Sequence, residues 1–233
     1  MQTYSEENYL KQIFNLQEGG KERISTSSLA LELGINAASV TEKLKRLAIK
    51  NLLVYEKSKG VALTEEGKAI AVRVIRKHRI WETFLVKQLN FGWEEVHEIA
   101  EQLEHIKSDS LINRIEAQLG FPRFDPHGDP IPDLNGNIST PCFRALTDLK
   151  IGEKARVTGV KSDASEFLLL FKKLGFSIGT QIEIIEIEAF DNSIELIMNG
   201  KDTVRLSKEI GTMIFASTKK SCCMLDIGTE GCS

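Results

Sequence analysis

The chain has 233 residues, a formal net charge of −3 and 42% hydrophobic residues, enough for about one to three domains with their own cores. No apolar run approaches the roughly 20 residues that a membrane span needs, and the first residues show no signal-peptide pattern. Three of the four cysteines crowd into the last dozen residues, which excludes a disulfide framework. We therefore expect a cytoplasmic protein.

The charge is unevenly distributed along the chain. Residues 1–92 hold 15 lysines and arginines against 10 acidic residues, and the remainder has an acidic excess. Between residues 36 and 60, six basic residues stand against two acidic ones. A basic patch on an otherwise acidic chain indicates a local contact with a polyanion.

The same stretch has the pattern of a helix-turn-helix, in "STSSLALELGINAASVTEKLKRLAIKN". Ser25 or Thr26 can cap a first helix, and Gly34 can form the sharp turn before a second helix. Next comes "LLVYEKSKGVALT", two short alternating runs around a glycine turn, which is typical of a hairpin wing. Together with the basic patch, these features predict a winged helix-turn-helix DNA-binding domain in residues 1–64.

The expected DNA contacts lie in the two helices of this motif and in the wing. Small or polar side chains at the start of the second helix suit the major groove, and lysines suit phosphates. These residues are Thr26, Asn36, Ala37, Ala38, Ser39, Thr41, Lys43, Lys45, Lys57 and Lys59.

A long helix is predicted next, from about Glu65 to Asn90. A helix advances roughly 100° per residue, so His78 and Glu82 fall in its apolar stripe. A carboxylate on such a stripe is costly unless a cation pairs with it or a metal binds it.

The segment "VHEIAEQLEHIKSD", residues 96–109, has the periodicity of an amphipathic helix. His97, Glu101, Glu104 and His105 share its polar face. Facing the preceding helix, they would complete a nitrogen and oxygen ligand set for a divalent transition metal. The alternative is a solvated helix face beside a satisfied core histidine.

Composition changes again after this helix. Residues 120–140 carry four of the five prolines, so we expect a linker or extended loop in which His127 is exposed to solvent. Short strand-like runs with glycine turns then predict a small barrel in residues 141–218, with one helix in "ASEFLLLFKKLG". Residues 219–233 read as a disordered tail, although its cysteines leave a redox or metal-binding role open. The fold class is therefore mainly α with a small β domain.

The order of these features resembles the metal-dependent repressors typified by the diphtheria toxin repressor and the manganese transport regulator. The resemblance is carried by the winged helix, "RKH" with "WE" following, "VHEIAEQLEHIKSD", "GDPIP" and the β domain, from about Ser5 to Ser217. It implies that residues 65–140 are a helical metal-binding and dimerisation domain with a Pro-rich linker, and that residues 141–218 form an SH3-like β-barrel. It also implies a homodimer that binds palindromic DNA operators when loaded with manganese(II) or iron(II), and so represses metal-homeostasis genes.

The resemblance further assigns metal ligands. It places Glu101, Glu104, His105 and a first-helix residue at one position, and it places His78, Glu82 and His97 at another. A glutamate at position 101 is typical of manganese-responsive members, whereas iron-responsive members usually have cysteine there. Hard oxygen ligands suit manganese better than thiolate does.

The N-terminal helix departs from the pattern of the family. Asn8 can offer only a neutral carbonyl oxygen, and Lys11 stands where the manganese type has a glutamate. A charged lysine ammonium cannot be a metal ligand. The binuclear arrangement is therefore doubtful for this chain.

Two acidic residues of the β domain complete the expected ligands. In the resembling full-length members, a carboxylate and an amide three residues apart reach the metal from the start of this domain's helix, and Asp163 and Glu166 match them. The alternative is helix capping, with Asp163 as the N-cap and Glu166 three residues later.

Two other functions stay open at this point. The metal could be purely structural in a winged-helix regulator. A helical metalloenzyme is the other alternative, but "HEIAE" is one residue short of the H-E-x-x-H zinc motif because Glu101 replaces the second histidine. We expect no enzymatic activity.

Overall fold

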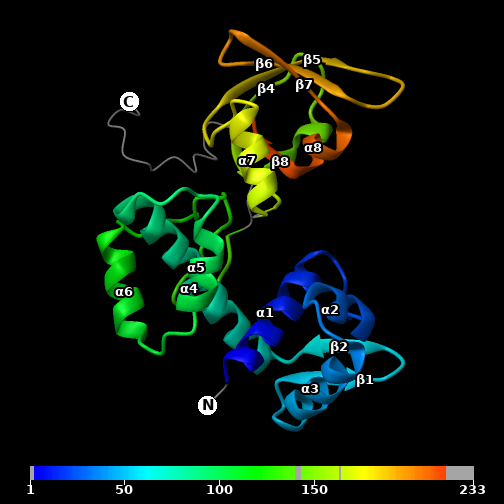
Figure 1. Ribbon diagram of the computed structural model, residues 1–233, viewed down its shortest axis with the longest axis vertical. Coiled ribbons are helices and arrows are strands. Elements are labelled where there is room, and N and C mark those ends of the chain that lie inside the picture. The colour runs from blue at the N-terminus through cyan, green and yellow to red at the C-terminus, as the bar shows by residue number, and fades with distance from the viewer. Residues whose placement is uncertain (1–2, 140–142, 163, 219–233) are drawn as a thin grey trace. The chain divides into compact units, whose positions relative to one another are not determined.

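The computed structural model describes residues 3–139, 143–162 and 164–218 (Figure 1). The chain divides into two compact units. The first comprises residues 1–78, 102–107 and 132–137, as far as they are described, and the second comprises the rest. The long helix α4 (Glu65–Leu89) runs through both units, because the division falls after His78.

The first unit contains the predicted winged helix, drawn in blue to cyan in Figure 1. Its elements are α1 (Tyr4–Glu18), α2 (Thr26–Glu32), α3 (Ala37–Ile49), β1 (Leu53–Glu56) and β2 (Gly60–Leu63). The side chains of Thr3, Ser25 and Asn36 cap the three helices by accepting backbone N–H groups. Ser25 is thus the cap of α2, and Thr26 is its first residue. β1 and β2 pair antiparallel as the predicted wing.

The winged helix closes around one apolar core. Leu10 and Ile13 of α1 are fully buried together with Leu44 and Leu47 of α3. Gly34 has a φ of +63°, a left-handed conformation that glycine adopts at little cost, and it makes the turn between α2 and α3.

Two short helices follow α4, where the sequence predicts one longer helix over residues 96–109. α5 spans Val96–Leu103 and α6 spans Asp109–Gln118. The single helix expected over residues 96–109 is therefore wrong, because Ser108 accepts the N–H of Leu111 and starts a new helix.

The loop after α6 folds tightly, contrary to the expectation of an extended linker. Asp125 Oδ1 accepts the backbone N–H groups of His127 at 2.8 Å and Asp129 at 2.9 Å. The carbonyl of His127 accepts the N–H of Val160 at 2.9 Å. The prediction that His127 is solvent-exposed was wrong. The bond to Val160 and the stacking of its ring on Trp93 leave it only 3% exposed.

The β domain is one antiparallel sheet with the strand order β3-β8-β4-β5-β6-β7. Its strands are β3 (Arg144–Ala145), β4 (Lys154–Val160), β5 (Gln181–Ile187), β6 (Ile194–Met198), β7 (Asp202–Leu206) and β8 (Ile214–Ser217). Its helices are η1 (Leu146–Asp148), α7 (Ser165–Lys173) and α8 (Lys208–Met213). In residues 143–162 and 164–218, no pairing joins the end strands β3 and β7, so the expected closed barrel was wrong.

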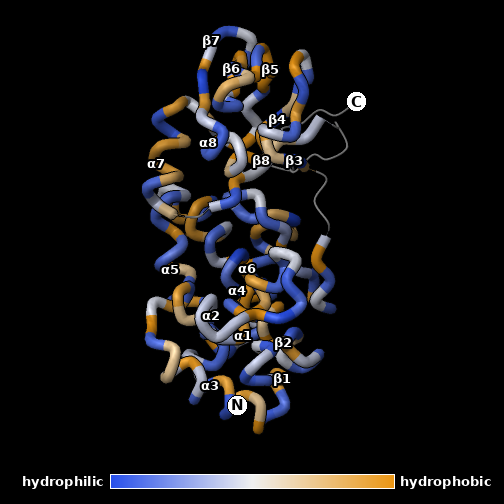
Figure 2. Tube along the Cα trace, turned by 90° about the vertical axis from the view of Figure 1, so that its right-hand side faces the viewer, coloured by the Kyte–Doolittle hydropathy of each residue, from blue (hydrophilic) through white to orange (hydrophobic). Residues whose placement is uncertain are grey.

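The core of this domain follows from strand alternation and the apolar face of α7. Ile194, Leu196 and Met198 of β6 point inward at every second position, and Figure 2 shows the apolar character of β5 and β6 in orange. Phe171 of α7, 1% exposed, fills the same core.

Two further expectations concern membrane spans and the C-terminal tail. None of the helices in the described residues combines the length and hydropathy that crossing a membrane requires. The expected disordered tail at residues 219–233, with its three cysteines, lies outside the described residues, as does Cys142.

Gly128 provides a test of how tightly the loop is held against β4. It has a φ of +93°, and an added Cβ would lie 2.3 Å from the carbonyl oxygen of Thr158. We expect Gly128→Ala to lower the free energy of unfolding by about 3 kcal/mol, through backbone strain and overpacking. Urea unfolding followed by circular dichroism measures this loss.

Gly120→Ala is the matched control, because Gly120 has a φ of +76° but nothing within 4 Å of an added Cβ. It should cost only about 1 kcal/mol, from the positive φ alone. Equal losses in the two variants would contradict a close loop–strand contact.

Candidate metal centre

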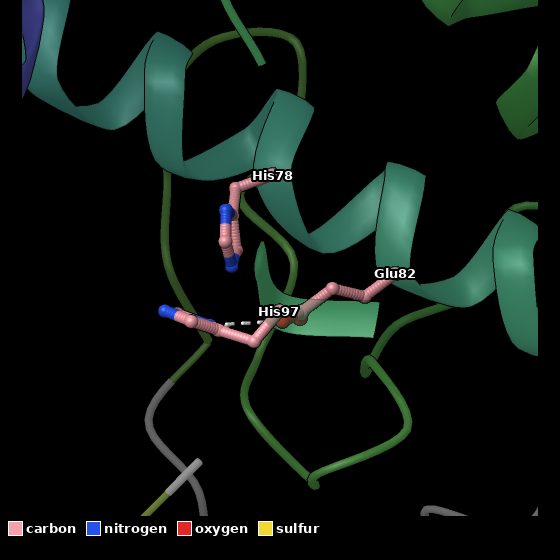
Figure 3. A group of neighbouring side chains, drawn as sticks. All are labelled: His78, Glu82 and His97. Atoms are coloured by element: carbon pink, nitrogen blue, oxygen red, sulfur yellow. Dashed lines mark ion pairs between the residues drawn. The ribbon is translucent and has the colours of Figure 1, made fainter. Parts of the chain in front are cut away.

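Glu82 is the buried carboxylate around which the polar groups of the second unit gather. It lies in the apolar stripe of α4 and is 2% exposed. His97 Nδ1 lies 3.4 Å from Glu82 Oε1, and His127 Nδ1 lies 3.6 Å from Glu82 Oε2. Figure 3 shows the Glu82–His97 ion pair, with His78 one turn earlier on the same helix.

A second carboxylate joins Glu82 and His127 from the loop. One ligand atom each from Glu82, Asp125 and His127 lies within 4.8 Å of the other two, and all three residues are buried. We call these three residues the Glu82 cluster. Arg79, three residues before Glu82 on α4, lies beside the cluster, with its Nε 3.6 Å from Asp125 Oδ2.

The charges in the Glu82 cluster strongly perturb one another. Burial opposes the charged form of the His127 imidazole, but Glu82 and Asp125 outweigh it and raise its pKa to about 9. Burial, together with the negative charges of Asp129 and Glu82, raises the pKa of the Asp125 carboxyl above its ordinary value. A protonated His127 thus partly balances the carboxylates near pH 7.

The donor set of the Glu82 cluster fits a divalent metal. Two buried carboxylates and an imidazole are hard to borderline donors of the kind that manganese(II) and iron(II) accept. Buried carboxylates in a low-dielectric interior also need positive charge nearby. The imidazole would lose its proton to such an ion, since only the neutral ring can be a ligand.

Glu104 forms a separate centre in the first unit. Its side chain is fully buried, and it lies in the turn after α5 rather than on the helix face that the sequence predicts. Lys11 Nζ of α1 lies 2.9 Å from Oε1 and 2.8 Å from Oε2 of Glu104. His78 Nδ1 lies 2.6 Å from Oε2. We call Lys11, His78 and Glu104 the Glu104 cluster.

His105 and Asn8 lie next to this cluster. His105 Nε2 is 3.7 Å from Glu104 Oε1, and its Nδ1 is 2.6 Å from Glu7 Oε2. Tyr4 stacks on the His105 ring at 4.7 Å between centroids. Asn8 Oδ1 is buried and has no hydrogen-bond partner within the described residues.

The remaining predicted ligands are Glu101, Asp163 and Glu166. Glu101 is half-buried, with its Oε1 3.7 Å from His97 Nε2. Asp163 lies outside the described residues. Glu166 is exposed, and α7 begins with Ala164 as an N-cap that has no side-chain hydrogen bond, so the capping alternative with Asp163 as the N-cap does not hold.

Asp125 and His127 are the residues that reasoning from the sequence missed. The prolines and glycines around them predict a linker or extended loop, in which only His127 is singled out, as a solvent-exposed residue. The signal was the Asp-x-His spacing at residues 125–127, directly before "GDP", which places two donor side chains in one tight turn.

The predicted DNA contacts form an exposed surface at the start of α3 and in the wing. Asn36, Ala37, Ala38 and Ser39 are exposed, as are Lys45, Lys57 and Lys59. Thr26, Thr41 and Lys43 are half-buried. Two of these side chains also have structural roles: Asn36 caps α3, and Thr41 Oγ1 donates to the carbonyl of Ala37.

Models of three known domains match successive parts of the chain. Residues 1–61 match the N-terminal DNA-binding domain of the iron-dependent repressors, and residues 64–133 match the metal-binding and dimerisation domain of the same repressors. Residues 144–218 match the FeoA domain.

Individual relatives agree with these matches. The chain is 30% identical to the diphtheria toxin repressor of Corynebacterium glutamicum, over 88% of this chain and 96% of the relative. It is 35% identical to the iron-dependent repressor IdeR of Mycobacterium tuberculosis, and that match spans 55% of each protein, so it covers only about half the length of the relative.

A solved structure is similar over nearly the whole chain. A manganese-dependent transcriptional repressor in complex with manganese has a TM-score of 0.82 and 36% identity, covering 91% of this chain and 98% of that one. From the matched domains and the full-length relative, the chain belongs to the iron-dependent repressor family of metal-dependent transcriptional repressors, which includes the diphtheria toxin repressor.

Proposed function

We propose that this protein is a transcriptional repressor that binds palindromic operator DNA as a homodimer when it holds manganese(II) or iron(II). The observation that carries the proposal is the Glu82 cluster, a buried set of two carboxylates and one imidazole in a chain that also has a winged helix. The relative whose structure contains manganese supports the choice of metal.

The chain's own groups account for the need for metal. Glu82 and Asp125 bring negative charge into the interior, and Arg79 and a protonated His127 offset part of it. A bound divalent ion would add positive charge next to these carboxylates and would take the place of the proton on His127. His97, beside Glu82, and Glu101, beside His97, are further donors that we assign to this centre.

The winged helix supplies the DNA contacts. The exposed start of α3 presents small side chains to the base edges, and Ser39 is the polar group among them. Lys43, Lys45 and Lys57 lie on or beside this surface and suit phosphates. Lys59 also pairs with Glu56 at 2.8 Å, so it must exchange that partner for a phosphate.

We expect DNA affinity to depend on the metal. A site selected from random DNA by the manganese-loaded protein should be bound at least about tenfold more weakly after chelation, a coupling of about 1.4 kcal/mol. Glu82→Gln keeps the shape of the side chain but removes its charge, so it should abolish the response. Fluorescence anisotropy with labelled DNA, titrated with manganese(II) or iron(II), measures both effects.

Asp129→Asn is the matched control, because Asp129 lies in the same loop but outside the Glu82 cluster, 3.7 Å from Arg79. It should retain the metal response. Equal affinity with manganese and with chelator in the wild type would refute metal sensing. Loss of the circular dichroism spectrum in Glu82→Gln would instead favour a purely structural metal.

The lysine contacts predict a distinct salt dependence. Lys43→Ala, Lys45→Ala and Lys57→Ala should each flatten the logarithmic dependence of affinity on salt by about one unit, since each removes a phosphate contact. Ser39→Ala should instead change which sequences are selected. Titrations at several salt concentrations measure the slope.

Lys154→Ala is the control for these variants. Lys154 is an exposed lysine of β4 that pairs with Glu183 at 3.2 Å, far in sequence from the winged helix. Its slope should match that of the wild type. If the three winged-helix variants also keep the wild-type slope, the DNA surface lies elsewhere.

A further inference from the structure

Lys11 neutralises the Glu104 carboxylate from within the chain. Both oxygens of Glu104 accept from its ammonium, at 2.9 and 2.8 Å, and the two side chains are 6% and 0% exposed. Few lysines are buried this completely, and those that are need a partner of opposite charge. The Glu104 cluster therefore already contains a cation.

This arrangement conflicts with Glu104 as a simple metal ligand. An incoming divalent ion needs the lone pairs that the ammonium now occupies. Two positive charges a few ångströms apart in a buried site also repel strongly. The residues of the first unit fit a divalent ion only after Lys11 has left Glu104.

Other donors of a metal position are nevertheless in place. Asn8 lies three residues before Lys11 on α1, and its buried Oδ1 has no partner among the described residues. His105 Nε2 lies 3.7 Å from Glu104 Oε1. A site made of these groups would be usable if the ammonium were absent.

We propose that Lys11 is a resident cation that competes with divalent metal for Glu104. The lysine thereby makes the Glu104 position the weaker one, so the first metal equivalent goes to the Glu82 cluster. This inference rests on the proposed function, because it concerns how the same metals are distributed over the chain.

The competition also has a structural consequence in the first unit. Lys11 belongs to α1 of the winged helix, and Glu104 belongs to the segment 102–107 of the same unit. Their ion pair fastens α1 to this segment in the absence of metal.

Lys11→Met tests the proposal, because methionine keeps much of the length of the side chain and loses its charge. We expect the second manganese equivalent to bind at least tenfold more tightly than in the wild type, with the first equivalent unchanged. Equilibrium dialysis against manganese(II), with the bound metal counted by mass spectrometry, gives both constants. Adding Glu104→Gln to Lys11→Met should remove the gain.

Lys50→Met is the matched control. Lys50 also pairs with a carboxylate of α1, at 2.8 Å from Glu6, but it has no part in the Glu104 cluster. Its manganese binding should match that of the wild type. A second equivalent that binds Lys11→Met no more tightly than the wild type would overturn the proposal.

The unfolding of the variants is itself informative. Lys11→Met can leave the Glu104 carboxylate unpaired, and the variant protein can then fail to fold. Lys11→Gln, whose amide can still donate to Glu104, is therefore measured in parallel. Variants that fold only with manganese support the exchange of lysine for metal, and variants that stay unfolded with manganese contradict it. If the wild type binds no manganese at all, the proposed function is contradicted. If Lys11→Met binds the second manganese equivalent with the affinity of the wild type, only the role of Lys11 is contradicted.

Discussion

The burial of two carboxylates, Glu82 and Glu104, is the constraint on which the rest of this structure depends. Each is almost fully removed from water, and a buried carboxylate requires positive charge close by. The two units meet this requirement differently. Glu104 has a lysine ammonium and an imidazole within 3 Å, at 2.8 and 2.6 Å. Glu82 lies 3.4 and 3.6 Å from the imidazoles of His97 and His127 and shares its site with a second carboxylate, so in the proposed function a metal ion adds positive charge there.

The different surroundings of Glu104 and Glu82 follow from the local structure of each unit. In the first unit, the Lys11–Glu104 pair joins the middle of α1 to the segment 102–107 without a metal ion. In the second, Asp125 reaches Glu82 only because the loop turns tightly around its carboxylate and Gly128 packs against β4. The part to which we assign the metal response is therefore the one whose geometry depends on a loop and a strand.

The sequence predicted the elements that have a strong apolar periodicity or clear cap and turn residues at their ends. The winged helix, α4 and most of the strands follow from apolar patterns, caps and glycine turns, and they are confirmed. The polar face assigned to residues 96–109 failed because α5 ends at Leu103 and the next helix begins after the Ser108 cap, so Glu104 and His105 lie in the turn between them. His127 failed because its burial comes from hydrogen bonds to residues more than 30 positions away. The domain boundaries and the ligand roles stay predictions.

The most direct test is anomalous diffraction from crystals grown with one manganese equivalent per chain, recorded on both sides of the manganese absorption edge. The account predicts one strong anomalous peak among Glu82, Asp125 and His127, with Lys11 still bonded to Glu104. A principal peak at Glu104, with Lys11 turned away and the Glu82 cluster empty, would contradict it.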